Sequence, residues 1–141
     1  MLKVLVPVDG SETSLRALEH LIGTLHWLKD AAEIHLINVQ YPLHGDVSVF
    51  VDKEQIRQFH QDEGLKALAA AREKLDAGGV GYVHHIGIGD PAHVIAHYAR
   101  EKAIDQIVMG TRGLGAVAGL LLGSVAAKVI HLADAPVLLV K

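Results

Sequence analysis

Short apolar runs and longer amphipathic runs alternate along the whole chain, and this alternation restricts the fold more than any other feature of the sequence. Each apolar run is rich in aliphatic residues, as expected of a strand that is covered on both faces. Successive parallel strands need crossover connections, which are usually helices. The sequence therefore predicts an α/β protein with an open five-stranded parallel sheet and helices on both faces. The predicted strands are 2–8, 33–39, 80–88, 104–110 and 135–141, of which 80–88, with its glycines and histidines, is expected at an edge.

Helical periodicity and capping residues define the predicted helices between these strands. The second predicted helix runs from Asp52 to about Ala77. The third follows Asp90 as N-cap, with Pro91 as its first helical residue, and the fourth runs from about Gly123 to Leu132. The apolar residues of the first two helices are expected to form their buried sides: Leu15, Leu18, Ile22, Leu25 and Leu28 in the first, and Ile56, Phe59, Leu65, Leu68 and Leu75 in the second.

The composition is typical of a folded globular domain. Of the 141 residues, 50% are hydrophobic and 21% are charged, so we predict a single domain over residues 1–141. The absence of cysteine excludes disulfides and thiolate chemistry. A net charge of −3 argues against a nucleic-acid partner, which would require a basic face. The longest uncharged run, 113–127, is shorter than the roughly 20 residues of a membrane-spanning helix, and the first residues do not resemble a signal peptide. The predicted location is therefore the cytoplasm, without membrane insertion.

The predicted sheet restricts where a ligand can bind. In open parallel sheets, ligands bind beyond the carboxyl ends of the strands, at the point where the strand order reverses. Four segments follow predicted strands and are expected at this edge: 9–11, 39–41, 89–90 and a glycine-rich segment, residues 109–126, which we call the glycine segment.

The glycine segment holds five glycines and a single charge, that of Arg112. A membrane-inserted hairpin, a linker and a loop that approaches a ligand are competing interpretations. Glycines let the backbone come close to a phosphate, and a helix that begins near Gly123 offers unpaired amides. Arg112 can pair with an anion, and Ser124 adds a hydroxyl donor. From spacing alone, an irregular surface loop remains an equal alternative.

Two known phosphate-binding patterns do not fit the glycine segment. The Walker pattern requires a lysine after its last glycine, whereas Gly123 is followed by Ser124. Gly113, Gly115 and Gly119 loosely imitate the dinucleotide fingerprint. That fingerprint belongs after the first strand of a fold, and here the glycines follow the fourth, so we reject it.

A third pattern fits. Gly110, two residues, Gly113, nine residues and then Gly123-Ser124 resemble the nucleotide-binding motif G-x2-G-x9-G-[ST] of the universal stress protein family. The resemblance extends over the whole chain, through "VPVDGSE", "GDP", "IVMGTRGLG", "LLLGSVAAKV" and the closing "APVLLVK". It implies a Rossmann-like sheet of strand order 3-2-1-4-5 with ATP at the carboxyl edge, with or without Mg²⁺. Because every motif glycine is present, the resemblance is to the ATP-binding members of the family.

The resemblance also implies the nucleotide contacts. At the adenosine end, Asp9 would reach the adenosine, and the backbone around Val39 would read the edge of the adenine. The full set of implied contacts is Pro7, Val8, Asp9, Ser11, Val39, Met109, Gly110, Arg112, Gly113, Gly123, Ser124 and Val125.

At the phosphate end, residues 110–113 with Arg112 would wrap the ribose and phosphates, and residues 123–125 would hold the phosphates. The family pattern often has a hydroxyl residue two positions after the serine, where this chain has Ala126. One phosphate donor is therefore expected to be missing, which bears on affinity rather than on the class of nucleotide.

Other groupings of reactive residues give weaker signals. His93 and His97 lie one helical turn apart, but Val94 stands where a zinc protease needs glutamate, so we predict no metal site. His84 and His85 are adjacent on a strand and point to opposite faces. None of the four serines lies in a nucleophile elbow, and Ser11 is better explained as a helix cap. We predict no catalytic residue.

The predicted function is that of a universal stress protein that binds ATP as a regulatory or sensing ligand in the stress response. Its expected partners are an adenine nucleotide, an unidentified client protein and a second copy of the chain, paired through the C-terminal strand. A slow ATPase or adenylate-transferring enzyme on the same fold is one alternative. A scaffold that binds no nucleotide is another, and the sequence does not separate ATP from AMP or a cyclic nucleotide.

Overall fold

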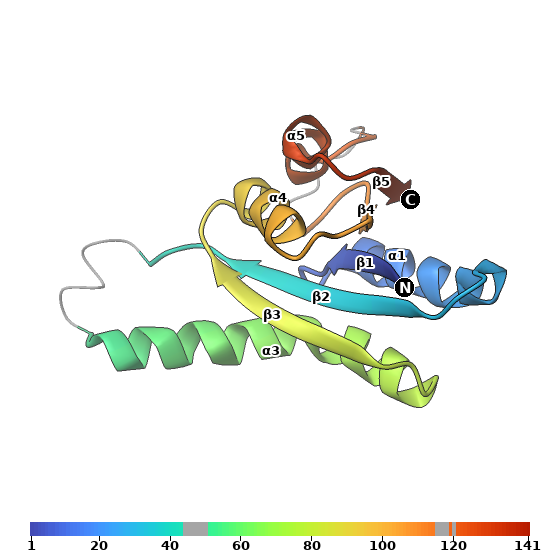
Figure 1. The fold of residues 1–141 in the computed structure, drawn as a ribbon. Helices are drawn as coiled ribbons and strands as arrows, with labels where there is room; N and C mark the ends of the chain where they lie inside the picture. Colours follow the sequence, from blue (N-terminus) through green and yellow to red (C-terminus); the bar gives the residue numbers. More distant parts are fainter. Residues whose placement is uncertain (44–50, 115–118, 120) are drawn as a thin grey trace.

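A computed structural model describes residues 1–43, 51–114, 119 and 121–141 (Figure 1). Its five strands form one parallel sheet in the order β3-β2-β1-β4-β5, which confirms the predicted fold class and strand order. β3 lies at an edge, as its composition predicted. In chain order the elements are β1 (Leu2–Pro7), α1 (Glu12–Thr24), the short 3-10 helix η1 (Leu25–Trp27), β2 (Ala32–Gln40), α3 (Lys53–Ala77), β3 (Tyr82–Ile88), α4 (Pro91–Glu101), β4 (Gln106–Gly110), α5 (Ser124–Leu132) and β5 (Val137–Val140).

Two hydrophobic cores lie on opposite faces of the sheet. Because side chains alternate along a strand, Val4 and Val6 of β1 face α1 and α3, whereas Leu5 faces α4 and α5. Figure 1 shows the same layering, with α4 and α5 on one side of the sheet and α3 on the other. Strands buried on both faces explain why their sequences are nearly continuous apolar runs.

The buried side of α3 differs from the predicted one. Leu68 and Leu75 are buried as expected, but Phe59 is 46% exposed. The buried residues include Gly64 and Ala71 instead. A Cβ at Gly64 would lie 2.6 Å from Ile86 of β3, so this glycine allows the helix to pack closely on the sheet. A prediction based on large apolar side chains overlooks a contact made by small ones.

The first helix is shorter than predicted. α1 ends at Thr24, so Leu25 lies in η1 and Leu28 follows it. The buried side is formed by residues Ser14, Ala17, Leu18 and Leu21, while Ile22 is only partly buried. The apolar stripe therefore continued across a change from α-helical to 3-10 geometry, which periodicity alone did not reveal.

Side-chain caps set the starts of three helices. Ser11 and Asp90, predicted as caps, accept backbone amides at the N-termini of α1 and α4. Asp52, predicted as the first residue of the second helix, instead caps α3, which begins at Lys53. α5 starts at Ser124 with Gly123 as its N-cap, and within the described residues no side chain caps it. Its first amides are therefore directed at the space beyond the sheet without a capping partner.

None of the helices in the described part of the chain combines the length and the apolarity that crossing a membrane requires. Part of the uncharged run 113–127 lies outside the described residues, as do residues 44–50, between the second predicted strand and the second predicted helix.

Candidate functional site

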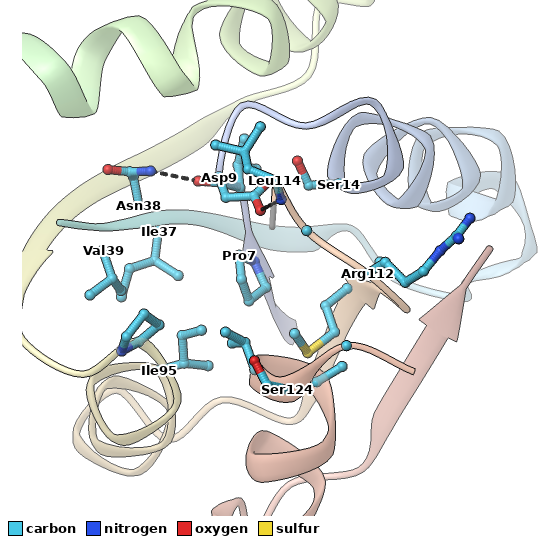
Figure 2. Close-up of a pocket in the computed structure, with 18 of the residues that line it drawn as sticks. Pro7, Asp9, Ser14, Ile37, Asn38, Val39, Ile95, Arg112, Leu114 and Ser124 are labelled. Atoms are coloured by element: carbon cyan, nitrogen blue, oxygen red, sulfur yellow. Dashed lines mark hydrogen bonds between the residues drawn. The ribbon is translucent and has the colours of Figure 1, made fainter. Parts of the chain in front are cut away.

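A pocket of about 430 Å³ opens at the carboxyl ends of β1, β2 and β4 (Figure 2). The strand order reverses between β1 and β4, so the pocket lies at the switch point where open α/β sheets bind ligands. The first turns of α4 and α5 complete its wall. Its volume is within the range typical of small-molecule sites.

The structure brings together almost all of the residues predicted for the site. Ser11 is the exception: its Oγ accepts the amide of Ser14, and it lines a smaller depression between α1 and α3. The lining of the main pocket includes Pro7, Val8, Asp9, Val39, Met109, Gly110, Arg112, Gly113, Gly123, Ser124 and Val125.

The pocket also has lining residues that the sequence reasoning did not name as contacts. Two of them follow from simple spacing: Ile37 lies two residues before Val39 on the same strand face, and Ile95 lies one turn after Pro91 on α4. The additional lining residues are Ser14, Ile37, Asn38, Gln40, Tyr41, Pro91, Ile95, Leu114 and Ala126.

Buried polar side chains fix the end of β2 to the segment after β1. Asn38 is only 3% exposed, and its Nδ2 donates to the carbonyl of Val8 at 2.8 Å (Figure 2). Gln40 in turn donates from Nε2 to Oδ1 of Asn38 at 2.7 Å. This chain of hydrogen bonds holds the wall formed by the ends of both strands in place.

Among the described residues, no backbone group pairs with the amide or carbonyl of Val39 on the side that faces the pocket. In a parallel strand, successive residues direct their amide and carbonyl to alternate sides. The carbonyl of Ile37 accepts from Val8 on the β1 side, and the carbonyl of Gln40 accepts from Gly89 on the β3 side. The amide and carbonyl of Val39 therefore face the β1 side, beyond Pro7, the last residue of β1 that pairs with β2. One donor and one acceptor are presented side by side.

At the opposite end of the pocket, the first turn of α5 supplies backbone amides. Residues 124–126 line the pocket, and the first amides of a helix have no partner within the helix. The amide of Gly123 differs, because it donates to the carbonyl of Thr111 at 2.6 Å. In Figure 2 the guanidinium of Arg112 points away from the centre of the pocket, so this residue contributes mainly backbone to the lining.

Asp9 joins the segment after β1 to the glycine segment. Its Oδ1 accepts the amide of Ser11 at 2.9 Å. Its Oδ2 accepts the amide of Leu114 at 3.0 Å, as Figure 2 shows. Among the described residues that line the pocket, Asp9 carries the single negative charge and Arg112 the single positive one.

Asp90 lies beside the pocket and joins α4 to α5. Its Oδ2 accepts from Nδ1 of His93 at 2.6 Å and from Nζ of Lys128 at 3.2 Å. The hydrogen bonds from His93, with a smaller contribution from Lys128, lower the pKa of Asp90 to about 2. His93 is thus paired with a carboxylate. In the described part of the chain, no group of three or more histidine, aspartate or glutamate side chains is placed to hold a metal ion.

A second polar cluster lies between β2, β3 and α4, outside the pocket lining. Nδ1 of the buried His35 lies 2.8 Å from the hydroxyl of Tyr98, and Nε2 lies 3.1 Å from Glu33. His85 stacks on the Tyr98 ring, as expected if it points to the face opposite His84. Burial lowers the pKa of His85 and raises that of Tyr98.

The fold and the pocket define an open α/β protein with a ligand-sized cavity at its switch point. A sequence model of the universal stress protein family matches residues 1–141, and the chain belongs to that family. The universal stress protein YxiE of Bacillus subtilis is 37% identical over 150 residues, which cover 99% of this chain and 98% of that relative. The universal stress protein MJ0531 of Methanocaldococcus jannaschii is 37% identical over 145 residues, covering 99% and 81% of the two chains.

Solved structures of related proteins have the same fold. The structure of MJ0577 from Methanocaldococcus jannaschii superposes with a TM-score of 0.84 at 29% identity, covering 99% of this chain and 95% of that one. A universal stress protein in complex with cAMP gives a TM-score of 0.72 at 27% identity, covering 99% and 97%. An Arabidopsis thaliana family member with AMP bound gives 0.67 at 28% identity, covering 100% and 92%.

Proposed function

We propose that this protein binds an adenine nucleotide in the pocket, with ATP as the principal ligand, and uses it as a regulatory or sensing signal. The observation that carries the proposal is the pairing of two features in one cavity. The open donor and acceptor of Val39 lie at one end, and the uncapped first turn of α5 lies at the other. The first suits the edge of a base, and the second suits a phosphate.

The proposed base is adenine because of the order of donors and acceptors. Adenine carries an amino donor at N6 beside an acceptor at N1, which complement the carbonyl and the amide of Val39. Guanine carries an acceptor at O6 beside a donor at N1, so both contacts would be mismatched. A site built around hydrogen bonds rejects a mismatched analogue strongly, because its own polar groups are left unpaired. Pro7, Ile95 and the side chain of Val39 supply apolar surface for the ring.

The proposed phosphate contacts are the amides of Ser124 and Val125 and the hydroxyl of Ser124. The bond between Gly123 and the Thr111 carbonyl assigns Gly123 a different task, which is to hold the glycine segment against α5. Ala126 offers its amide alone, consistent with one fewer hydroxyl donor than the family pattern often has. Arg112 would have to rotate towards the pocket to meet a phosphate.

Related proteins support the class of ligand. The solved structures with cAMP and AMP are of family members that are 27% and 28% identical to this chain. Both ligands contain adenine, ribose and phosphate, the parts to which the two ends of this pocket are assigned. The proposed choice of ATP among adenine nucleotides rests on the complete glycine motif.

Calorimetric titration of nucleotide-free protein tests the proposal. ATP should bind saturably, and GTP should bind at least about tenfold more weakly, since a mismatched buried hydrogen bond costs about 1–3 kcal/mol. Titrations with AMP and cAMP show how much the further phosphates of ATP contribute to its affinity. Mass spectrometry of the molecule that co-purifies with the protein identifies the physiological ligand. Equal binding of GTP, or no binding of any adenine nucleotide, would contradict the proposal.

A role in binding is favoured over efficient hydrolysis. Phosphoryl transfer needs cations spread over the transferring group and a positioned nucleophile. In the described part of the chain, the lining holds one cationic side chain, Arg112, and one carboxylate, Asp9, whose oxygens accept two backbone amides. Contacts that stabilise ground and transition states equally do not raise turnover. A slow ATPase or an adenylate-transferring enzyme is the second candidate.

We further propose that two copies pair through β5 and that the dimer acts on a client protein in the cytoplasm. The carbonyls of Pro136 and Val140 accept the amides of Ile107 in β4 and of Thr111 just after it. By alternation, the amides of Val137 and Leu139 face the outer edge of the sheet. An apolar edge strand is an aggregation hazard that pairing with a second chain removes.

A further inference from the structure

Asp9 bridges two segments that are far apart in the sequence but adjacent at the pocket. Its Oδ1 accepts from Ser11, two residues away, and its Oδ2 accepts from Leu114, 105 residues away. Both bonds are charge-assisted hydrogen bonds of ordinary length, the kind that contribute most to holding a loop. Residues 112–114, on the far side of this bridge, line the pocket.

Gly113 is matched to the same carboxylate. A Cβ placed on Gly113 would collide with Oδ2 of Asp9, and among the described residues the atoms within 4 Å of that Cβ all belong to Asp9. Gly113 is not among the residues with positive φ, so its backbone would accept alanine. Within the described part of the chain, the requirement for glycine here therefore comes from Asp9, which makes the two positions a coupled pair.

We propose that Asp9 is a positioning residue that fastens residues 112–114 of the glycine segment to the end of β1, and that this contact forms one edge of the ligand pocket before any ligand binds. The inference builds on the proposed function, since the edge serves nucleotide binding. Each carboxylate oxygen keeps a second lone pair, so Asp9 can still accept a sugar hydroxyl without releasing Leu114. A preorganised edge of this kind raises affinity by lowering the ordering cost of binding.

Trypsin cleavage after Arg112 reports the contact in ligand-free protein. Arg112 is exposed, and cleavage there gives fragments 1–112 and 113–141, which mass spectrometry resolves. Asp9→Ala should speed this cleavage about tenfold, the effect expected for loss of one charge-assisted hydrogen bond. Cleavage after the exposed Lys29, at the opposite end of the sheet, should change less than about twofold.

Matched variants separate fastening from general destabilisation. Asp52→Ala removes a carboxylate that caps α3 elsewhere, and it should leave cleavage after Arg112 unchanged. Asp9→Asn keeps one acceptor oxygen, so it should give an intermediate rate. If cleavage after Arg112 is unchanged in Asp9→Ala, or rises equally after Lys29, the proposal is overturned.

A double-mutant cycle tests the coupling with Gly113. Hydrogen exchange of the Leu114 amide should accelerate about tenfold in Gly113→Ala, because the added methyl displaces the carboxylate. In the Asp9→Ala background, Gly113→Ala should add less than about twofold, since the group that it collides with has gone. Additive effects would overturn the proposal. Gly81→Ala, where a Cβ meets open space, is the matched control.

The effect of Asp9→Ala on ATP binding is measured separately from cleavage and hydrogen exchange. If the proposed function holds, Asp9→Ala should weaken ATP binding at least about tenfold, through the lost edge and the lost acceptor. If wild-type protein binds no adenine nucleotide, the proposed function fails. The cleavage and exchange comparisons in ligand-free protein then still decide whether Asp9 fastens the segment.

Discussion

Gly123→Val is the substitution for which the structure best separates ligand binding from folding. Gly123 has φ −72° and ψ 162°, an extended conformation that any residue adopts, so backbone strain does not contribute. A Cβ there would lie 3.2 Å from the Cα of Arg112 and 3.3 Å from the carbonyl oxygen of Thr111. Both atoms belong to the backbone. The glycine segment must therefore shift away from α5 to accommodate the valine.

The expected cost to folding is modest. Overpacking costs about 1–3 kcal/mol, and valine is a poorer N-cap than glycine by up to about 1 kcal/mol. A loss of about 2 kcal/mol leaves a domain of ordinary stability, about 5–15 kcal/mol, folded at 25 °C. The cost to binding is larger, because the shift displaces the first turn of α5 relative to the base end. Loss of two hydrogen bonds to a charged phosphate, at about 1.5 kcal/mol or more each, predicts at least a hundredfold weaker ATP binding.

Calorimetry and urea unfolding measure the two effects on the same preparation. Gly81→Val is the matched control, since a Cβ at Gly81 meets no atom within 4 Å, and it should bind ATP as the wild type does. Gly123→Ala, which adds only the Cβ, provides a milder step if the valine variant proves too unstable. A folded Gly123→Val protein that binds ATP within about threefold of wild-type affinity would refute the assignment of the phosphates to this turn.

Four further predictions concern assembly, catalysis and stability. Leu139→Pro should convert a dimer to a monomer in light scattering while the sheet stays intact. Leu138→Pro should unfold the chain instead, because the amide of Leu138 faces β4. A wild-type monomer at micromolar concentration would exclude pairing through β5. Purified protein should hydrolyse ATP at a rate well below about 1 per second. A faster rate that disappears when the carboxylate of Asp9 is removed would show that the protein is an enzyme. Asp90→Ala should lower the free energy of unfolding by about 1 kcal/mol near neutral pH, the usual value of an exposed cap. Because the pKa of Asp90 is depressed from 3.8 to about 2, this difference should be complete above pH 3.8 and vanish as the pH falls through 2; a difference that persists below pH 2 would exclude the carboxylate as its source. Gly64→Ala should destabilise by about 1 kcal/mol net, since overpacking against Ile86 outweighs the gain in helix propensity. In an Ile86→Ala background, which lacks all three colliding carbons, this cost should disappear; an outright gain in stability from Gly64→Ala alone would contradict the close packing of α3.

Local patterns in the sequence determined the elements and the edge at which the pocket lies. The strand runs and the capping residues Ser11 and Asp90 are encoded within a few consecutive positions, and the structure confirms them. The resemblance to the universal stress protein family supplied the strand order, which local patterns do not contain. The strand order reverses between β1 and β4, and most of the predicted site residues lie around one pocket at that point.

Only the tertiary structure decided which atoms of those residues face the pocket. The sequence placed Gly123 in the site but did not show that its amide is already bonded to Thr111. It named Arg112 as a cation for the phosphates, whereas the side chain points away from the centre of the pocket. It assigned Asp9 to a ligand without showing that its carboxylate accepts the amide of Leu114. Each of these outcomes depends on a distance between residues that packing brings together, and periodicity and capping report only on neighbours along the chain.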